Sequence, residues 1–194
     1  SRRSDLYDRR MRCFIAVTPP ADVVSDIDRF LEPRRTATES SPWRWSRPTT
    51  YHLTLAFMAD HPGHCIEELA QALDEWAGRH APLAMNIAGA GGFRGPERAK
   101  VLYLGVPGIA AVQLGEWSGQ LRALVTHHGG SPDGAGFRAH LTIARAQRAQ
   151  NAGRLLQALD TYASREFVVP EVVLVESRLA SRAYEVLHRA ILRG

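Results

Sequence analysis

Apolar positions along the chain follow two spacings, the two-residue period of strands and the wider period of amphipathic helices. An apolar run at 13–17 predicts a buried strand, and an apolar stripe at 23–31 predicts a helix that ends before a polar loop at 33–42. The elements predicted next are a strand at 51–58, a helix at about 64–79 and a strand at about 83–90.

The same order of elements then occurs a second time. The predicted elements are a strand at 100–106, a helix at about 109–127, a strand at 137–144, a helix at about 151–163, and strands at 166–176 and about 183–192. We therefore expect an internal repeat with halves at about 11–93 and 100–177 and a closing strand at 183–192. Because no long linker separates the halves, a single domain over 11–194 is expected, preceded by a polar tail at 1–10.

The central strand of each half carries nearly the same pentapeptide, HLTLA at 52–56 and HLTIA at 140–144. Successive side chains of a strand point to opposite faces, so His52 shares a face with Thr54, and His140 shares a face with Thr142. The leucine faces would pack against helices. A pseudo-two-fold repeat would then turn the two His/Thr faces toward each other across a groove.

Two imidazoles on opposite walls of a groove suit an in-line displacement at phosphorus. One histidine would deprotonate the attacking oxygen and the other would protonate the leaving oxygen, because imidazole titrates near neutral pH. Thr54 and Thr142 could donate hydrogen bonds to the non-bridging oxygens, and Arg145 could add a charge-assisted clamp. This arrangement requires no metal and no cofactor. The repeat alone does not say which histidine is the acid. The alternative is a structural repeat whose histidines bind each other or the backbone.

Composition narrows the class of protein. Hydrophobic residues make up 45% and charged residues 23%, as in ordinary soluble globular proteins. We expect a cytoplasmic location, because the chain contains no apolar run long enough for a membrane span or a signal peptide, and two cysteines are too few for a disulfide framework or a thiolate zinc site. We also expect a monomer.

Charge adds a hint about partners. The formal net charge is +4, and Lys100 is the only lysine among 24 basic residues. Arginine matches phosphate oxygens bidentately, so the bias toward arginine favours a partner that carries phosphate. A genome rich in arginine codons would explain the same bias.

These motifs resemble the two-histidine phosphoesterases, and within them the RNA 2′,3′-cyclic phosphodiesterases, also called 2′-5′ RNA ligases. The resemblance covers almost the whole chain from Met11. The blocks that carry it are MRCFIAV, WRWSRPTTYHLTLAF, GGFRGPERAKVLYLGV, FRAHLTIAR and VVLVESRLASRAYEVLHRAIL. It implies a bilobal α+β fold, with a β-sheet in each lobe, helices on the outer faces and the active groove between the lobes.

The resemblance also implies an activity, namely metal-independent opening of 2′,3′-cyclic phosphate ends of RNA or nucleotides to 2′-phosphates. His52 would be the proton donor and His140 the proton acceptor, with phosphate held by Thr54, Thr142 and Arg145. Trp45 and Phe57 are candidates for stacking on the terminal base or ribose. Arg44, Arg47 and Arg94 are candidates for binding the RNA on the 5′ side of that terminus.

Reversible 2′-5′ ligation is the same chemistry in reverse. Where the family often has a lysine and a glycine, this chain ends its first motif in AFMAD, which bears on substrate preference. The alternatives are activity on ADP-ribose cyclic phosphate, cleavage of 2′-5′ oligonucleotides, or an RNA-end binding module without turnover.

Overall fold

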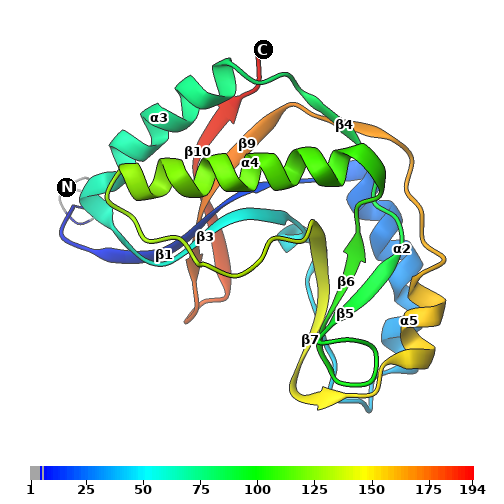
Figure 1. Cartoon of the computed structure of the whole chain (residues 1–194). Coiled ribbons are helices and arrows are strands. Elements are labelled where there is room, and N and C mark those ends of the chain that lie inside the picture. The colour runs from blue at the N-terminus through cyan, green and yellow to red at the C-terminus, as the bar shows by residue number, and fades with distance from the viewer. Residues whose placement is uncertain (1–4, 6) are drawn as a thin grey trace.

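The strands form two four-stranded antiparallel sheets and a small two-stranded sheet (Figure 1). The computed structural model describes residue 5 and residues 7–194. Residues 1–4 and 6 of the predicted tail lie outside the described residues, and the first strand begins at Arg10. The predicted α+β class is confirmed. Among the described residues, no helix has both the length and the apolar character needed to cross a membrane.

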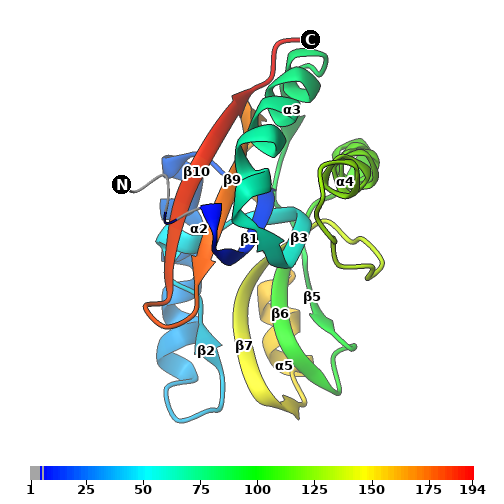
Figure 2. The same cartoon turned by 90° about the vertical axis from the view of Figure 1, so that its left-hand side faces the viewer.

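The first sheet has the strand order β10-β9-β1-β3. Its strands are β1 (Arg10–Val17), β3 (Leu53–Pro62), β9 (Glu171–Arg178) and β10 (Ala183–Ile191). On one side it contacts two helices: α3 (Ile66–Gly78) meets β9 and β10, and α4 (Gly108–His127) meets β3 (Figures 1 and 2).

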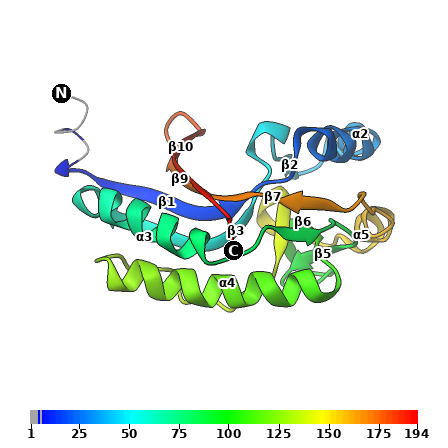
Figure 3. The same ribbon diagram turned by 90° about the horizontal axis from the view of Figure 1, so that it is seen from above.

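The second sheet has the order β2-β7-β6-β5. Its strands are β2 (Arg44–Trp45), β7 (His140–Gln150), β6 (Ala99–Gly105) and β5 (Ala90–Phe93). Helix α5 (Gly153–Leu159) contacts β5 (Figures 1 and 3), and the Tyr162 ring, which follows α5, meets the Phe30 ring of helix α2 (Ala21–Ala37) at 4.9 Å between centroids. The remaining elements are the paired strands β4 (Leu83–Met85) and β8 (Phe167–Val169) and two 3₁₀ turns, η1 (Pro48–Thr50) and η2 (Gly63–Cys65).

Strand alternation gives the first sheet two different faces. In β1, Cys13, Ile15 and Val17 belong to the main core, which is shared with the helices. Phe14 and Ala16 point the other way and form a second apolar cluster with Val173 and Val175 of β9. This second face is free to form one wall of a site, because the helices cover the first.

The two sheets do not follow the two predicted halves of the sequence. Strands β9 and β10, from the end of the chain, join β1 and β3, whereas β2, from the first half, pairs with β7. Helix α4 follows β6 of the second sheet but packs on the first. The sheets are therefore built from interleaved segments of one chain.

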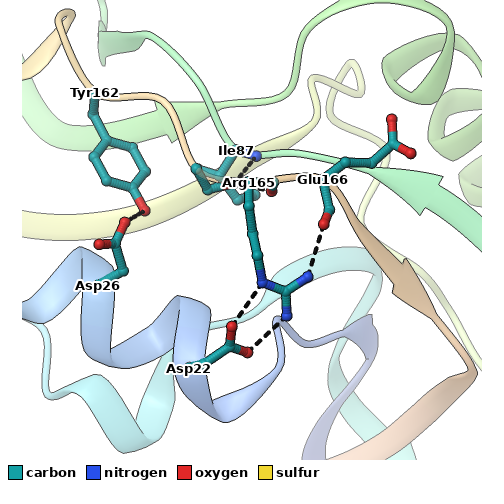
Figure 4. Close-up of polar contacts among 7 residues, drawn as sticks. Asp22, Asp26, Ile87, Tyr162, Arg165 and Glu166 are labelled. Atoms are coloured by element: carbon teal, nitrogen blue, oxygen red, sulfur yellow. Dashed lines mark hydrogen bonds and ion pairs between the residues drawn. The ribbon is translucent and has the colours of Figure 1, made fainter.

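Polar contacts fasten α2, which follows the first strand, to the segment after α5. Figure 4 shows Arg165 reaching Asp22 through Nε and Nη2, at 2.6 and 2.8 Å, and the Tyr162 hydroxyl donating to Asp26 at 2.9 Å. The Arg165–Asp22 ion pair is exposed and adds little stability. The Tyr162 side chain is buried, so its hydrogen bond to Asp26 contributes more.

Several predicted boundaries are wrong. The strand predicted at 83–90 is two strands that pair with different partners, because Gly89, at φ 75°, turns the chain between them. The strand predicted at 166–176 is likewise divided at Pro170, into β8 and β9.

Other elements end elsewhere than predicted. Helix α2 continues through Pro33 into the predicted loop at 33–42. The side chain of Arg34 donates to the Phe30 carbonyl one turn earlier, and that of Arg35 donates to the Asp28 carbonyl two turns earlier. Helix α5 is shorter than the predicted 151–163, and β7 begins only at His140 but continues to Gln150.

Candidate active site

A pocket of about 320 Å³ is lined by residues of both four-stranded sheets. We call it the histidine pocket. Six of the seven site residues predicted from the sequence line it: His52, Thr54, Phe57, His140, Thr142 and Arg145. The structure therefore brings the two repeated motifs together at one site, one motif from β3 and its approach and one from β7.

Each histidine ring is held by a backbone carbonyl two residues earlier. Nδ1 of His52 lies 2.7 Å from the carbonyl oxygen of Thr50, and Nδ1 of His140 lies 2.6 Å from that of Arg138. A carbonyl only accepts, so Nδ1 carries the proton and donates it in both rings. In a neutral ring Nε2 is then the nitrogen without a proton, and it is available to a molecule in the pocket.

Aromatic rings fix the planes of the two imidazoles. His52 is stacked on Phe14 at 4.5 Å between ring centroids and meets Tyr184 edge-on at 5.5 Å. His140 meets Phe93 edge-on at 4.9 Å and Tyr103 at 5.5 Å. Each ring is therefore positioned by one hydrogen bond and two aromatic contacts, which limits its rotation.

Two β-bulges at matching positions decide which further side chains reach the pocket. In β3, Ala56 and Thr54 pair with the successive residues Ile15 and Ala16, so Leu55 is an extra residue. In β7, Ala144 and Thr142 pair with the successive residues Leu102 and Tyr103, so Ile143 is extra. A bulge resets the alternation of faces.

The reset explains two of the lining residues. Strict alternation from His140 would turn Arg145 to the core face, and strict alternation from His52 would do the same to Phe57. Instead the two residues of each bulge are buried together and the next side chain returns to the pocket face. The sixth position of each motif, Phe57 or Arg145, therefore lines the pocket with its histidine and threonine.

The environment favours neutral imidazoles. Burial lowers the pKa of His52 below its usual value, the bond to Thr50 opposes this, and the charges of His140 and Arg145 lower the pKa further. Burial also lowers the pKa of His140, against its bond to Arg138, and the charges of Arg145 and Arg138 add to the decrease. Arg145 thus acts on both histidines, and an anion bound between them would act in the opposite direction.

Sequence reasoning missed several residues of the pocket. They are Arg12, Phe14, Ser46, Thr50, Asp133, Ser177 and Tyr184. Alternation along β1 predicts that Arg12 and Phe14 share one face of the strand, but it does not say whether that face lines a pocket. The others come from segments that only the tertiary fold brings near the motifs. Arg12 also lies 4.4 Å from the centroid of the Phe57 ring, so a cation covers part of that candidate stacking residue.

Trp45 does not line the histidine pocket, and its Nε1 donates to the Thr38 hydroxyl at 2.9 Å. It lines a neighbouring hollow of about 310 Å³ together with Arg44, Arg47 and Arg182. This arginine hollow shares Ser46, Thr50, Arg145, Ser177 and Tyr184 with the histidine pocket, so the two are continuous. Arg94, the third arginine singled out in the sequence, lies elsewhere, at the tip of the β5–β6 hairpin.

The donor set offers no obvious metal centre. Among the described residues, no three His, Cys, Asp or Glu side chains gather in a way that could hold a metal ion. The histidine pocket has two imidazoles and the single carboxylate Asp133, one of whose oxygens accepts from the backbone N–H of Ala135 at 3.1 Å.

This fold with this pair of motifs defines a known family. The family model of the 2′-5′ RNA ligase superfamily matches residues 20–180, and the chain belongs to that superfamily. The chain is 32% identical over 177 residues to the RNA 2′,3′-cyclic phosphodiesterase of Geobacillus stearothermophilus, an alignment that covers 88% of this chain and 54% of that protein.

A second relative, the RNA 2′,3′-cyclic phosphodiesterase of Aeropyrum pernix, is 27% identical over 118 residues, which cover 61% of this chain and 65% of that protein. The chain thus spans between half and two thirds of the lengths of these two relatives. Its fold is similar to the crystal structure of TT0787 of Thermus thermophilus, with a TM-score of 0.76, 24% identity, and coverage of 95% of this chain and 99% of that one.

Proposed function

We propose that the protein hydrolyses 2′,3′-cyclic phosphate ends of RNA or nucleotides to 2′-phosphomonoesters. The observation that carries this proposal is the pair of imidazoles in one pocket, each with Nδ1 held by a carbonyl and Nε2 left for proton transfer. The names of the two curated relatives describe the same substrate class.

The step needs one base and one acid. Nε2 of His140 takes a proton from water as its oxygen attacks phosphorus, and Nε2–H of His52 gives a proton to the 3′ oxygen as the phosphorus–3′-oxygen bond breaks. One water is consumed, the 2′ ester bond remains, and the two histidines exchange protonation states. The assignment of His52 as acid and His140 as base follows the family resemblance.

Hydroxyl and guanidinium groups would stabilise the charge that develops on the phosphate. Thr54 and Thr142 lie beside the two histidines on the same pocket, and Arg145 joins them because of the bulge in β7. Hydrogen bonds from such groups are strongest to the most charged state, which is the transition state.

The proposal extends to longer RNA. The arginine hollow continues from the histidine pocket and carries Arg44, Arg47 and Arg182 with the Trp45 ring, a combination that suits a phosphate backbone and a stacked base. RNA on the 5′ side of the terminal ribose would lie there. The site is formed by a single chain, which supports a monomer as the active species.

The same geometry supports ligation. If a ribose 5′-hydroxyl replaces water at His140, its oxygen attacks phosphorus, the 3′ oxygen leaves with the proton from His52, and a 2′-5′ phosphodiester forms. No further reactant is required, because the cyclic ester supplies the leaving group.

Phosphorus NMR tests the proposal. We expect the protein, incubated with EDTA and either a 2′,3′-cyclic nucleotide or a short RNA with that end, to give a 2′-phosphate. A 3′-phosphate would contradict the predicted leaving group, and no reaction on either substrate would favour ADP-ribose cyclic phosphate, 2′-5′ oligonucleotides or a binding module. His52→Ala and His140→Ala should each lower turnover by about 10²-fold or more while far-UV circular dichroism is unchanged.

A further inference from the structure

A second basic hollow lies on the β5–β6 side of strand β7, whereas the arginine hollow lies on the β2 side. This hairpin hollow, of about 620 Å³, is lined by three cations, Arg94, Arg98 and Lys100, and three apolar residues, Phe93, Val101 and Ala149. The three cations are exposed, and none has an ion pair or side-chain hydrogen bond within the part of the chain that the structure describes. The acidic residue nearest to these cations in the sequence is Glu97, which lies in the same turn.

Two contacts connect the hairpin hollow to the chemistry. Phe93 lines the hollow, and its ring also meets the ring of His140 at 4.9 Å. Val101 lines the hollow too, and it pairs in register with Arg145 of the histidine pocket and with Phe93. The hollow therefore begins one to two strand spacings from the catalytic groups, about 5–10 Å.

The opposite histidine faces the other hollow. Tyr184 meets the His52 ring at 5.5 Å and also lines the arginine hollow. In an in-line displacement the attacking and leaving oxygens stand on opposite sides of phosphorus. The leaving 3′ oxygen belongs to the donor RNA and needs His52, whereas the attacking oxygen needs His140.

We infer that the hairpin hollow binds the acceptor RNA, the strand whose 5′-hydroxyl replaces water in ligation. This inference rests on the proposed function and on its assignment of the two histidines. The 5′-terminal ribose lies against Phe93 beside His140, and the first phosphates of the strand lie on Arg94, Arg98 and Lys100. Hydrolysis leaves the hairpin hollow unused, so its cations set the balance between ligation and hydrolysis.

The chemistry of the hairpin hollow fits that occupant. Unpaired guanidinium and ammonium groups bind phosphodiesters without reading sequence, and an aromatic ring offers a surface to a ribose or base. A strand that begins with a 5′-hydroxyl has its first phosphate one nucleotide away, so the hydroxyl can approach His140 while the charges stay on the cations.

The test compares the two reactions in one variant. The donor is a short RNA with a 2′,3′-cyclic phosphate, and the acceptor is a labelled RNA with a 5′-hydroxyl and a blocked 3′ end. In Arg94→Ala/Arg98→Ala/Lys100→Ala we expect the ratio of ligated to hydrolysed donor to fall about tenfold. In a plot of the logarithm of acceptor affinity in ligation against the logarithm of salt concentration, the slope should become shallower by about 0.7 for each phosphate that the variant no longer binds.

A matched variant controls for net charge. Arg29→Ala/Arg79→Ala/Arg154→Ala also removes three exposed cations, which come from α2, the end of α3 and α5. None of these residues lines the histidine pocket, the arginine hollow or the hairpin hollow. It should ligate and hydrolyse in the wild-type ratio. An equal fall in both variants would overturn the inference, because bulk charge would then explain the effect.

The remaining outcomes separate the inference from the proposed function. An unchanged ratio in the first variant overturns the inference, as does a wild-type protein that hydrolyses the donor but does not ligate at saturating acceptor. If the wild type does neither, the proposed function fails. Fluorescence anisotropy of the labelled acceptor then decides, and equal affinity in wild type and variant overturns the inference.

Discussion

At the scale of single residues, the hydrogen bond at Nδ1 determines which ring nitrogen of each histidine is available for proton transfer. His52 and His140 each donate to a carbonyl two residues earlier, so both present the same nitrogen to the pocket. In the proposed reaction, therefore, the protonation state of each ring, and not its tautomer, distinguishes the base from the acid.

Arg145 carries the first prediction at this scale. Burial lowers the pKa of both histidines, and the Arg145 charge lowers both further, so kcat/KM for a cyclic mononucleotide should be maximal below about pH 6.5. Arg145→Gln removes that charge, both pKa values rise, and both limbs of the pH profile should move to higher pH. The pair titrates as a unit, so the limbs belong to both rings.

Arg145→Lys is the matched control for this charge effect. It retains a cation and should keep the position of the profile, while losing the two-pronged contact to phosphate and therefore part of the rate. A profile for Arg145→Gln that coincides with that of the wild type would mean that the charge does not act on the histidines.

At the scale of the element, the bulges in β3 and β7 and the close pairing of β5 with β6 determine what reaches the pocket. Gly91 pairs with Tyr103, and a Cβ at position 91 would collide with the phenol end of that residue. Tyr103 in turn meets the His140 ring and accepts a hydrogen bond from Arg138 at 3.4 Å. The missing side chain in β5 is thus what lets Tyr103 support His140.

Gly91→Ala should therefore lower kcat for a cyclic mononucleotide about tenfold with a smaller change in KM, and cost about 1–3 kcal/mol of unfolding free energy. Gly119→Ala, on the exposed face of α4 where no atom lies near the added Cβ, is the control. It should raise the unfolding free energy by about 0.5–1 kcal/mol and leave kcat unchanged. Steady-state kinetics and urea denaturation measure both, and wild-type kcat in Gly91→Ala would disprove the supporting role of Tyr103.

At the scale of the whole molecule, the interleaving of segments makes the two sheets depend on each other. Helix α4 covers β3 although it follows β6, and the Tyr162–Asp26 bond joins α2 to the segment after α5. Unfolding of one sheet therefore breaks contacts that hold segments of the other sheet in place. We expect a single cooperative unfolding transition.

Tyr162→Phe tests this coupling. It leaves Asp26 without its partner and should lower the free energy of unfolding by about 1–2 kcal/mol, with one shared midpoint for tryptophan fluorescence and circular dichroism. Trp76 and Trp117 report on α3 and α4, while Trp45 reports on β2, so the signal covers both sheets. Two separate midpoints would show that the sheets unfold independently.

The sequence by itself determined the elements and the motif residues. Apolar periodicity predicts the main helices and strands, because burial of one face imposes it locally. Strand alternation alone places His52 with Thr54 and His140 with Thr142, and the repeated pentapeptide marks these four residues for one site. The sequence does not predict the short strand β2 or the separation of β4 from β5 at Gly89.

Only the tertiary structure decided what those motifs meet. Strand pairing brings Phe14, Ser177 and Tyr184 to the pocket from distant segments, and the bulges, which show up only against a partner strand, turn Arg145 and Phe57 back to its face. The same pairing separates Arg44 of β2 from Arg94, which directly follows β5 at the opposite edge of the second sheet. Register and bulges depend on contacts between strands far apart in the chain, so no local pattern of residues could specify them.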